Sequence, residues 1–215
     1  MHVVAIIGSA RRNGTVARIC RKVLEGAQDS GHSTEEVNLF DYQIESCRGC
    51  WSCAGSGSCP IPDDFAGLFE RVRIADAVVL GSPCYWGNIS APMKAFFDRH
   101  TGYAMLSPVD APEFSTLKPS RKFAKLRELA VRFGPREGLA GKRFVLVTAL
   151  TDPFPVSWLS RDLPQTLGAL RTYVKNLKGV ERGAIVCSDT LFRFQSGKEA
   201  RLLAKARAIG ARLAR

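Results

Sequence analysis

The chain has 215 residues, of which 46% are hydrophobic, and this size and composition suit a single α/β domain with a substantial core. No apolar run approaches the roughly 18 residues of a membrane span, and the five apolar residues before Gly8 are too few for a secretion signal, so we expect a cytoplasmic protein without membrane contact. The net charge of +11 gathers in residues 116–143 and 198–215. Neither segment contains a nucleic-acid-binding motif, so we expect a solvated basic surface and no nucleic-acid partner.

The first eighteen residues predict a buried strand, a polar loop and an amphipathic helix. Residues 3–7 are apolar and mostly β-branched, and apolar residues then recur at helical spacing from Val16 to Ala27. The loop over residues 8–15 lies at the amino end of that helix, where backbone N–H groups and the helix dipole favour an anion. The loop predicts a site for a phosphate monoester; the alternative is an ordinary turn with solvated arginines. The candidate ligands are Ser9, Thr15 and either Arg11 or Arg12.

The rest of the chain alternates between the two kinds of element. Apolar runs predict further strands over residues 33–40, 75–80, 143–150 and 180–188. Helical spacing predicts helices over residues 65–72, 90–97, 159–177 and 198–213. Pro164 indicates that the helix over residues 159–177 starts late or is kinked. This alternation predicts an α/β fold with a doubly wound, five-stranded parallel sheet and helices on both faces.

The stretch at about 101–141 is longer than a connection between two strands needs. Its start looks irregular, and residues 119–133 predict a basic amphipathic helix. We interpret the stretch as an insertion, a lid or an oligomer contact, within one domain that spans residues 1–215.

The seven cysteines are unevenly distributed. Their odd number and the lack of a secretion signal argue against a disulfide framework and favour metal or redox use. Cys47, Cys50, Cys53 and Cys59 share the loop over residues 41–62, and thiolates at this density suit an iron–sulfur cluster. The alternatives are a zinc site and a loop of packed or redox-sensitive thiols without a metal. Three others are predicted to be small buried residues: Cys20, Cys84 and Cys187.

A second candidate loop, residues 81–90, follows the strand over residues 75–80. Ligands of open α/β sheets bind outside the carboxyl ends of the strands, so this loop should lie beside the loop over residues 8–15. Two aromatics, Tyr85 and Trp86, precede polar side chains that include Asn88, and this combination suits a flat heteroaromatic ring. The alternative is that both aromatics belong to the core or to the surface.

The chain contains two longer motifs, Gly-Ser-Ala-Arg-Arg-Asn-Gly at residues 8–14 and Gly-Ser-Pro-Cys-Tyr-Trp-Gly-Asn-Ile-Ser-Ala-Pro-Met-Lys-Ala-Phe-Phe-Asp-Arg at residues 81–99. They resemble the two signatures of the NADPH-dependent FMN reductase family. The cysteine loop resembles that of its iron–sulfur flavoprotein branch. The resemblance covers residues 1–100 well and implies a flavodoxin-like fold that holds FMN. It implies that the phosphate and ribityl chain contact Ser9, Arg11, Asn13, Gly14 and Thr15. It implies that the isoalloxazine ring contacts Pro83, Cys84, Tyr85, Trp86, Gly87 and Asn88.

The resemblance also implies an activity, an FMN-dependent oxidoreductase with NAD(P)H as co-substrate and a small-molecule electron acceptor. Such an enzyme needs no catalytic acid–base pair, because the cofactor performs the chemistry. A homodimer or homotetramer is expected. The alternative is an electron carrier in which a [4Fe–4S] cluster on Cys47, Cys50, Cys53 and Cys59 and the FMN exchange electrons with a ferredoxin-like partner. A redox sensor that uses the cysteines as thiols is a third class.

Overall fold

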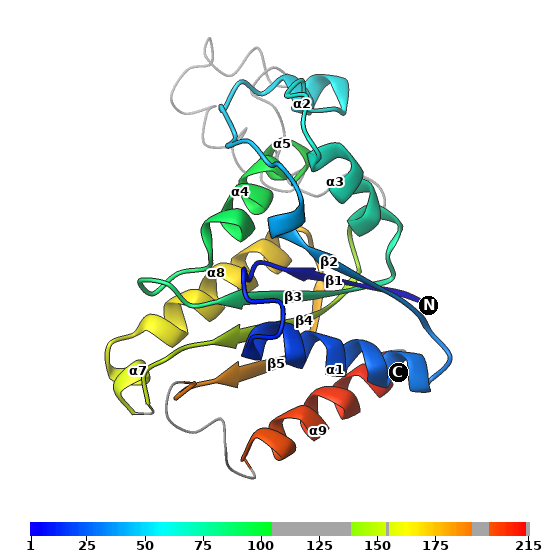
Figure 1. The fold of residues 1–215 in the computed structure, drawn as a ribbon. Helices are drawn as coiled ribbons and strands as arrows, with labels where there is room; N and C mark the ends of the chain where they lie inside the picture. Colours follow the sequence, from blue (N-terminus) through cyan, green and yellow to red (C-terminus); the bar gives the residue numbers. More distant parts are fainter. Residues whose placement is uncertain (105–138, 154, 191–197, 214–215) are drawn as a thin grey trace, which may run out of the picture.

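The computed structural model describes residues 1–104, 139–153, 155–190 and 198–213. Within them, five parallel strands form one sheet in the order β2-β1-β3-β4-β5 (Figure 1). The strands are β1 (His2–Ile7), β2 (Ser33–Asn38), β3 (Ala77–Pro83), β4 (Arg143–Ala149) and β5 (Val180–Cys187). This order confirms the predicted doubly wound sheet and puts its topological switch point between β1 and β3.

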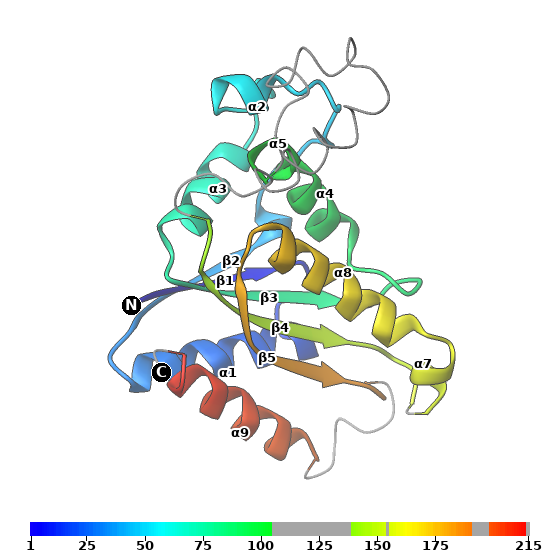
Figure 2. The ribbon, with the colours of Figure 1, turned by 180° about the vertical axis from the view of Figure 1, so that it is seen from behind.

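Helices cover both faces of the sheet (Figures 1 and 2). One face carries α1 (Thr15–Asp29) and α9 (Lys198–Ala211). The other carries α3 (Phe65–Ile74), α4 (Ala91–Arg99) and α8 (Asp162–Asn176). The shorter elements are the 3-10 turn η1 (Leu39–Asp41) and the helices α2 (Ser52–Ser56), α5 (Thr101–Ala104) and α7 (Val156–Leu159). No described helix is long and apolar enough to cross a membrane.

Alternating side chains of the strands supply the core on both sides. Val4 and Ile6 of β1 pack toward α3, α4 and α8, whereas Val3 and Ile7 pack toward α1 and α9. All four side chains are fully buried. A parallel strand covered on both faces needs an uninterrupted apolar run, which is why the sequence pattern of β1 is so clear.

Several element boundaries differ from the prediction for identifiable reasons. The strand over residues 33–40 ends at Asn38, whose side chain accepts a hydrogen bond from the backbone N–H of Phe40 (3.0 Å) and turns the chain into η1. The helix predicted over residues 159–177 starts late, as Pro164 indicates: α8 begins at Asp162, and Arg161, which adopts a left-handed conformation, separates it from α7. Pro164 is tolerated because it lies in the first turn of α8.

Two further predictions concern the connecting segments. The predicted loop over residues 41–62 contains the short helix α2, and the stretch that was expected to be irregular after residue 101 begins with α5. The helix predicted over residues 119–133 lies outside the described residues. The insertion at about 101–141 therefore stays a prediction for most of its length.

Candidate functional site

The two candidate loops meet at the carboxyl edge of the sheet. The backbone N–H of Gly8 donates a hydrogen bond to the carbonyl oxygen of Gly81 (2.8 Å), which joins the ends of β1 and β3. The N–H of Cys84 donates to the carbonyl oxygen of Ala149 (2.8 Å), which adds the end of β4. A cleft of about 310 Å³ opens between these loops. The predicted residues that line it are Ser9, Arg11, Asn13, Gly14, Thr15, Pro83, Cys84 and Tyr85.

The loop over residues 8–15 forms the polar end of the cleft. The backbone N–H of Gly14 donates to the carbonyl oxygen of Arg11 (3.0 Å), and this turn delivers the chain to the start of α1. Gly14 is the N-cap of α1 and has no side chain to occupy the first N–H groups of the helix. Those groups, the Ser9 hydroxyl and the Arg11 guanidinium surround a space suited to an anion.

The loop over residues 81–90 forms a tight turn on the other side. Tyr85 and Asn88 exchange backbone hydrogen bonds of 2.8 and 3.0 Å around Trp86 and Gly87, which both have positive φ angles of 51° and 70°. These angles match a two-residue hairpin turn of the primed type. A Cβ on Gly87 would lie 2.7 Å from the side-chain oxygen of Gln165 on α8, so the turn packs closely against that helix.

This turn explains which predicted ring contacts line the cleft. Tyr85 lines it and is half exposed, whereas Trp86, Gly87 and Asn88 do not line it. The side chain of Trp86 is fully exposed, because the left-handed turn directs it into solvent. A non-glycine residue in this conformation is strained, and such strain is concentrated at ligand-binding sites.

The cleft extends further than the two predicted loops. Val16 and Arg18 of α1 line it, as do Ala149 and Thr151 at the end of β4 and Thr190 after β5. Ala149 lies at the end of a predicted strand, and Thr151 and Thr190 follow predicted strands. The rule that ligands bind at the carboxyl ends of parallel strands was therefore the sequence signal for all three. Arg18 also forms an ion pair with Glu199 of α9.

Cys84 is the one cysteine among the residues that line the described cleft. Its sulfur lies 3.0 Å from the hydroxyl oxygen of Thr166 on α8. Burial raises the pKa of the Cys84 thiol, more than the contact with Thr166 lowers it. The prediction of buried cysteines is confirmed for Cys84 and Cys20 and wrong for Cys187, which is half-buried. The neutral thiol of Cys84 forms an apolar wall of the cleft.

The four clustered cysteines lie apart from the cleft, on residues 43–64, which we call the cysteine segment. It follows η1 and carries α2, which lies beyond α3 and α5 on that side of the sheet (Figure 1). Cys47 and Cys50 are exposed, Cys59 is half-buried and Cys53 is buried. The donor set has the chemistry of an iron–sulfur ligand set. In the described part of the chain, however, no three Cys, His, Asp or Glu side chains are gathered to hold a metal ion.

Comparison with known proteins identifies the family. The sequence profile of the NADPH-dependent FMN reductases matches residues 1–111. The chain is 37% identical over 99 residues to an iron–sulfur flavoprotein of Methanocaldococcus jannaschii, over 46% of this chain and 51% of the relative. It is 37% identical over 103 residues to an iron–sulfur flavoprotein of Archaeoglobus fulgidus, over 48% of this chain and 47% of the relative. The chain thus spans about half the length of the curated relatives it matches.

The fold is shared with solved structures of low sequence identity. An NAD(P)H:quinone oxidoreductase from Methanothermobacter marburgensis superimposes with a TM-score of 0.71 at 18% identity, over 100% of this chain and 98% of that one. This likeness extends the shared architecture beyond the profile match, through β4, β5 and the last helix. From its two signature loops, its flavodoxin-like sheet and the profile match over half its length, the chain belongs to the NADPH-dependent FMN reductase family.

Proposed function

We propose that this protein is an FMN-dependent NAD(P)H oxidoreductase that passes electrons to a small acceptor. The observation that carries the proposal is the cleft at the switch point of the sheet, with an anion site at one end and Tyr85 at the other. Its volume of about 310 Å³ falls in the range of small-molecule sites. The chemistry that FMN supplies when bound is acceptance of a hydride from a reduced nicotinamide and delivery of the electrons to the acceptor.

The residues of the cleft bind and orient the cofactor in this proposal. Ser9, Arg11 and the first N–H groups of α1 hold the phosphate, because each donates a hydrogen bond to an anion. Asn13 and Thr15 serve the ribityl chain. Pro83, Cys84 and Tyr85 form the wall beside the ring, where a neutral thiol and an aromatic face exclude water.

An exposed apolar surface adjoins the cleft. Tyr85 and Trp86 lie on the turn that packs against the start of α8, and Trp158 and Leu159 belong to α7, which precedes α8 directly. Exposed patches of this kind mark sites for ligands or other chains. We assign this surface to the nicotinamide and acceptor, and to contact between subunits of a homodimer or homotetramer.

The anion site is tested by replacing Arg11. Arg11→Ala removes a charged hydrogen bond worth about 1.5–3 kcal/mol, so we expect FMN to bind roughly 10- to 100-fold more weakly. Arg12→Ala is the matched control, because Arg12 pairs with Asp41 and does not line the cleft. Fluorescence titration of FMN measures both constants. Equal affinity in wild type and Arg11→Ala would show that the phosphate binds elsewhere.

We also propose, as a second candidate function, an electron carrier in which a [4Fe–4S] cluster is bound by Cys47, Cys50, Cys53 and Cys59. The support is the spacing of these four thiols and the printed name, iron–sulfur flavoprotein, of two relatives that are 37% identical to this chain over 99 and 103 residues. A ferredoxin-like protein is the partner that this second function implies.

Iron analysis after anaerobic purification separates the two candidates. The carrier predicts about four irons per chain, lost in Cys50→Ser while FMN is retained. Cys187→Ser is the control, because Cys187 lies on β5 outside the cysteine segment. An iron-free wild-type protein whose flavin is fully reduced by NADH or NADPH would leave the reductase as the function and exclude the cluster.

A further inference from the structure

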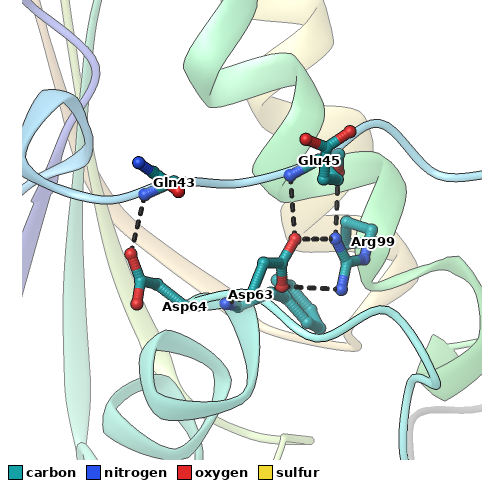
Figure 3. A network of polar contacts seen from close by, with 6 residues as sticks. Gln43, Glu45, Asp63, Asp64 and Arg99 are labelled. Atoms are coloured by element: carbon teal, nitrogen blue, oxygen red, sulfur yellow. Dashed lines mark hydrogen bonds and ion pairs between the residues drawn. The ribbon is translucent and has the colours of Figure 1, made fainter.

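The two ends of the cysteine segment are bonded to each other. The backbone N–H of Gln43 donates to the carboxylate of Asp64 (2.7 Å), and the N–H of Asp64 donates to the carbonyl oxygen of Gln43 (3.1 Å). The N–H of Glu45 donates to the carboxylate of Asp63 (2.8 Å) (Figure 3). The chain thus enters and leaves the segment at one hydrogen-bonded site, which we call the base of the cysteine segment.

Arg99, the last residue of α4, joins this base from the side (Figure 3). Its guanidinium donates two hydrogen bonds to the Asp63 carboxylate, of 2.5 and 3.0 Å, and one to the carbonyl oxygen of Glu45 (2.9 Å). It also lies over the ring of Phe65, 4.7 Å from the centroid. The side chains of Arg99 and Asp63 are only 1% and 4% exposed, so the ion pair is buried.

The pair stays charged despite this burial. Burial raises the pKa of Asp63, but the Arg99 hydrogen bonds and the N–H groups of Glu45 and Phe65 outweigh it and hold the pKa below its usual value. Burial likewise lowers the pKa of Arg99, and Asp63 more than reverses this, with a smaller contribution from Cys59. Apolar residues of similar volume usually stabilise a core as well as a buried ion pair does. Stability alone is therefore a weak reason for an ion pair at this place.

The same place adjoins the thiols. Cys53 belongs to the hydrophobic cluster that contains Phe65, and the half-buried Cys59 packs against that cluster. The helix α2, which carries Cys53, contacts α5, and α5 begins two residues after Arg99. The other end of α4 begins directly after the loop over residues 81–90 of the cleft. One rigid helix thus connects the cleft loop to the base of the cysteine segment.

We propose that Arg99 and Asp63 are positioning residues that clamp the cysteine segment to α4 and hold its thiols in place. The three hydrogen bonds of Arg99 fix the backbone of Glu45 and the start of α3 at once, which no apolar pair can do. The clamp keeps Cys53 buried and keeps the four cysteines at a constant position relative to the cleft loop. That the clamp holds the ligands of a metal cluster rests on the proposed second function. That it fixes the position of the thiols does not depend on a cluster.

The test compares three variants of the full chain. Arg99→Met breaks the pair, Arg99→Met with Asp63→Leu replaces it by apolar side chains, and Arg171→Met breaks the exposed two-bond pair with Glu181 as a matched control. Two readouts are used on protein freed of iron by a chelator, the melting temperature and the rate at which iodoacetamide alkylates Cys53. Cys20, which is fully buried in α1, is the internal reference. Iron content after anaerobic purification is the third readout.

We expect Arg99→Met to lower the melting temperature by about 10 °C, because one buried charge loses its partner. Cys53 should be alkylated on the order of tenfold faster, while Cys20 is unchanged. The double variant should regain the melting temperature but keep the fast Cys53 reaction and, if wild type holds iron, a low iron content. Arg171→Met should resemble wild type in every readout.

The opposite outcomes overturn the proposal. If the double variant protects Cys53 as well as wild type does, the ion pair is only a part of the core and positions nothing. Unchanged Cys53 protection in Arg99→Met has the same meaning. If Arg99→Met does not fold, Arg99→Lys replaces it in the same measurements, because lysine keeps the charge but has fewer hydrogen-bond donors. An iron-free wild type would overturn the cluster but not the clamp, since Cys53 protection still decides it.

Discussion

Replacing Gly26 by alanine is expected to destabilise the protein by about 3 kcal/mol or more. Gly26 lies where α1 crosses α9, and a Cβ there would be 1.9 Å from the carbonyl oxygen of Arg207 and 2.8 Å from its carbonyl carbon. Gly210 makes the reciprocal contact, since its Cβ would be 1.9 Å from the carbonyl oxygen of Val23. Both obstacles are backbone atoms, so the helices must separate. Denaturant unfolding of Gly26→Ala and Gly210→Ala measures the loss.

The matched control is Gly67→Ala. Gly67 lies within α3, and a Cβ there meets no atom within 4 Å. Alanine should therefore stabilise the protein by about 0.5–1 kcal/mol through helix propensity alone. The close approach of α1 and α9 would be disproved if Gly26→Ala behaved like Gly67→Ala.

Lowering the pH from 6.5 to 4 is expected to reduce the free energy of unfolding by about 3 kcal/mol because of His100. It is buried among the rings of Phe65, Phe96 and Tyr173. Its Nδ1 lies 2.7 Å from the carbonyl oxygen of Phe96 and therefore carries the proton of that hydrogen bond. Burial, with a smaller effect of the charge on Arg99, lowers the pKa of His100 to about 4.

The sign follows from proton binding. Between pH 4 and 6.5 the unfolded chain protonates His100 and the folded chain does not, so the free energy of unfolding falls as the pH falls. His100→Phe removes this titration and keeps a ring of similar size. Urea unfolding of both proteins at pH 7 and pH 4.5 measures how much the free energy of unfolding falls between the two pH values. Carboxylates such as Asp63 contribute equally in both proteins, so their contribution cancels when wild type and variant are compared. A parallel loss of stability in wild type and variant would contradict the assignment to His100.

The sheet could be predicted because its information is local. β1 is an unbroken apolar run, since it is covered on both faces, and the same holds for β3 and β4. Element ends were less predictable where a side chain redirects the backbone, as Asn38 does at the end of β2. The division between α7 and α8 depends on the left-handed conformation of Arg161, which no helical periodicity reveals.

The cleft was predictable in part, for a similar reason. Ser9 and Arg11 lie between a strand and a helix, and Thr15 is the first residue of that helix, so the local pattern already implies an anion site. Trp86 was predicted as a ring contact, but its place outside the cleft lining depends on a turn held by Tyr85 and Asn88. Thr190 was missed because its place depends on which strands are neighbours.

The sequence by itself determined the doubly wound parallel sheet with helices on both faces and the two loops that meet at its carboxyl edge, because these follow from periodicity and from short motifs. Only the tertiary structure decided what joins residues far apart in the chain. The pairing of Arg99 with Asp63, the contact of Gly26 with α9 and the burial of His100 each require elements to be placed side by side. Such contacts depend on distances in space, and the spacing of residues along the chain carries no record of them.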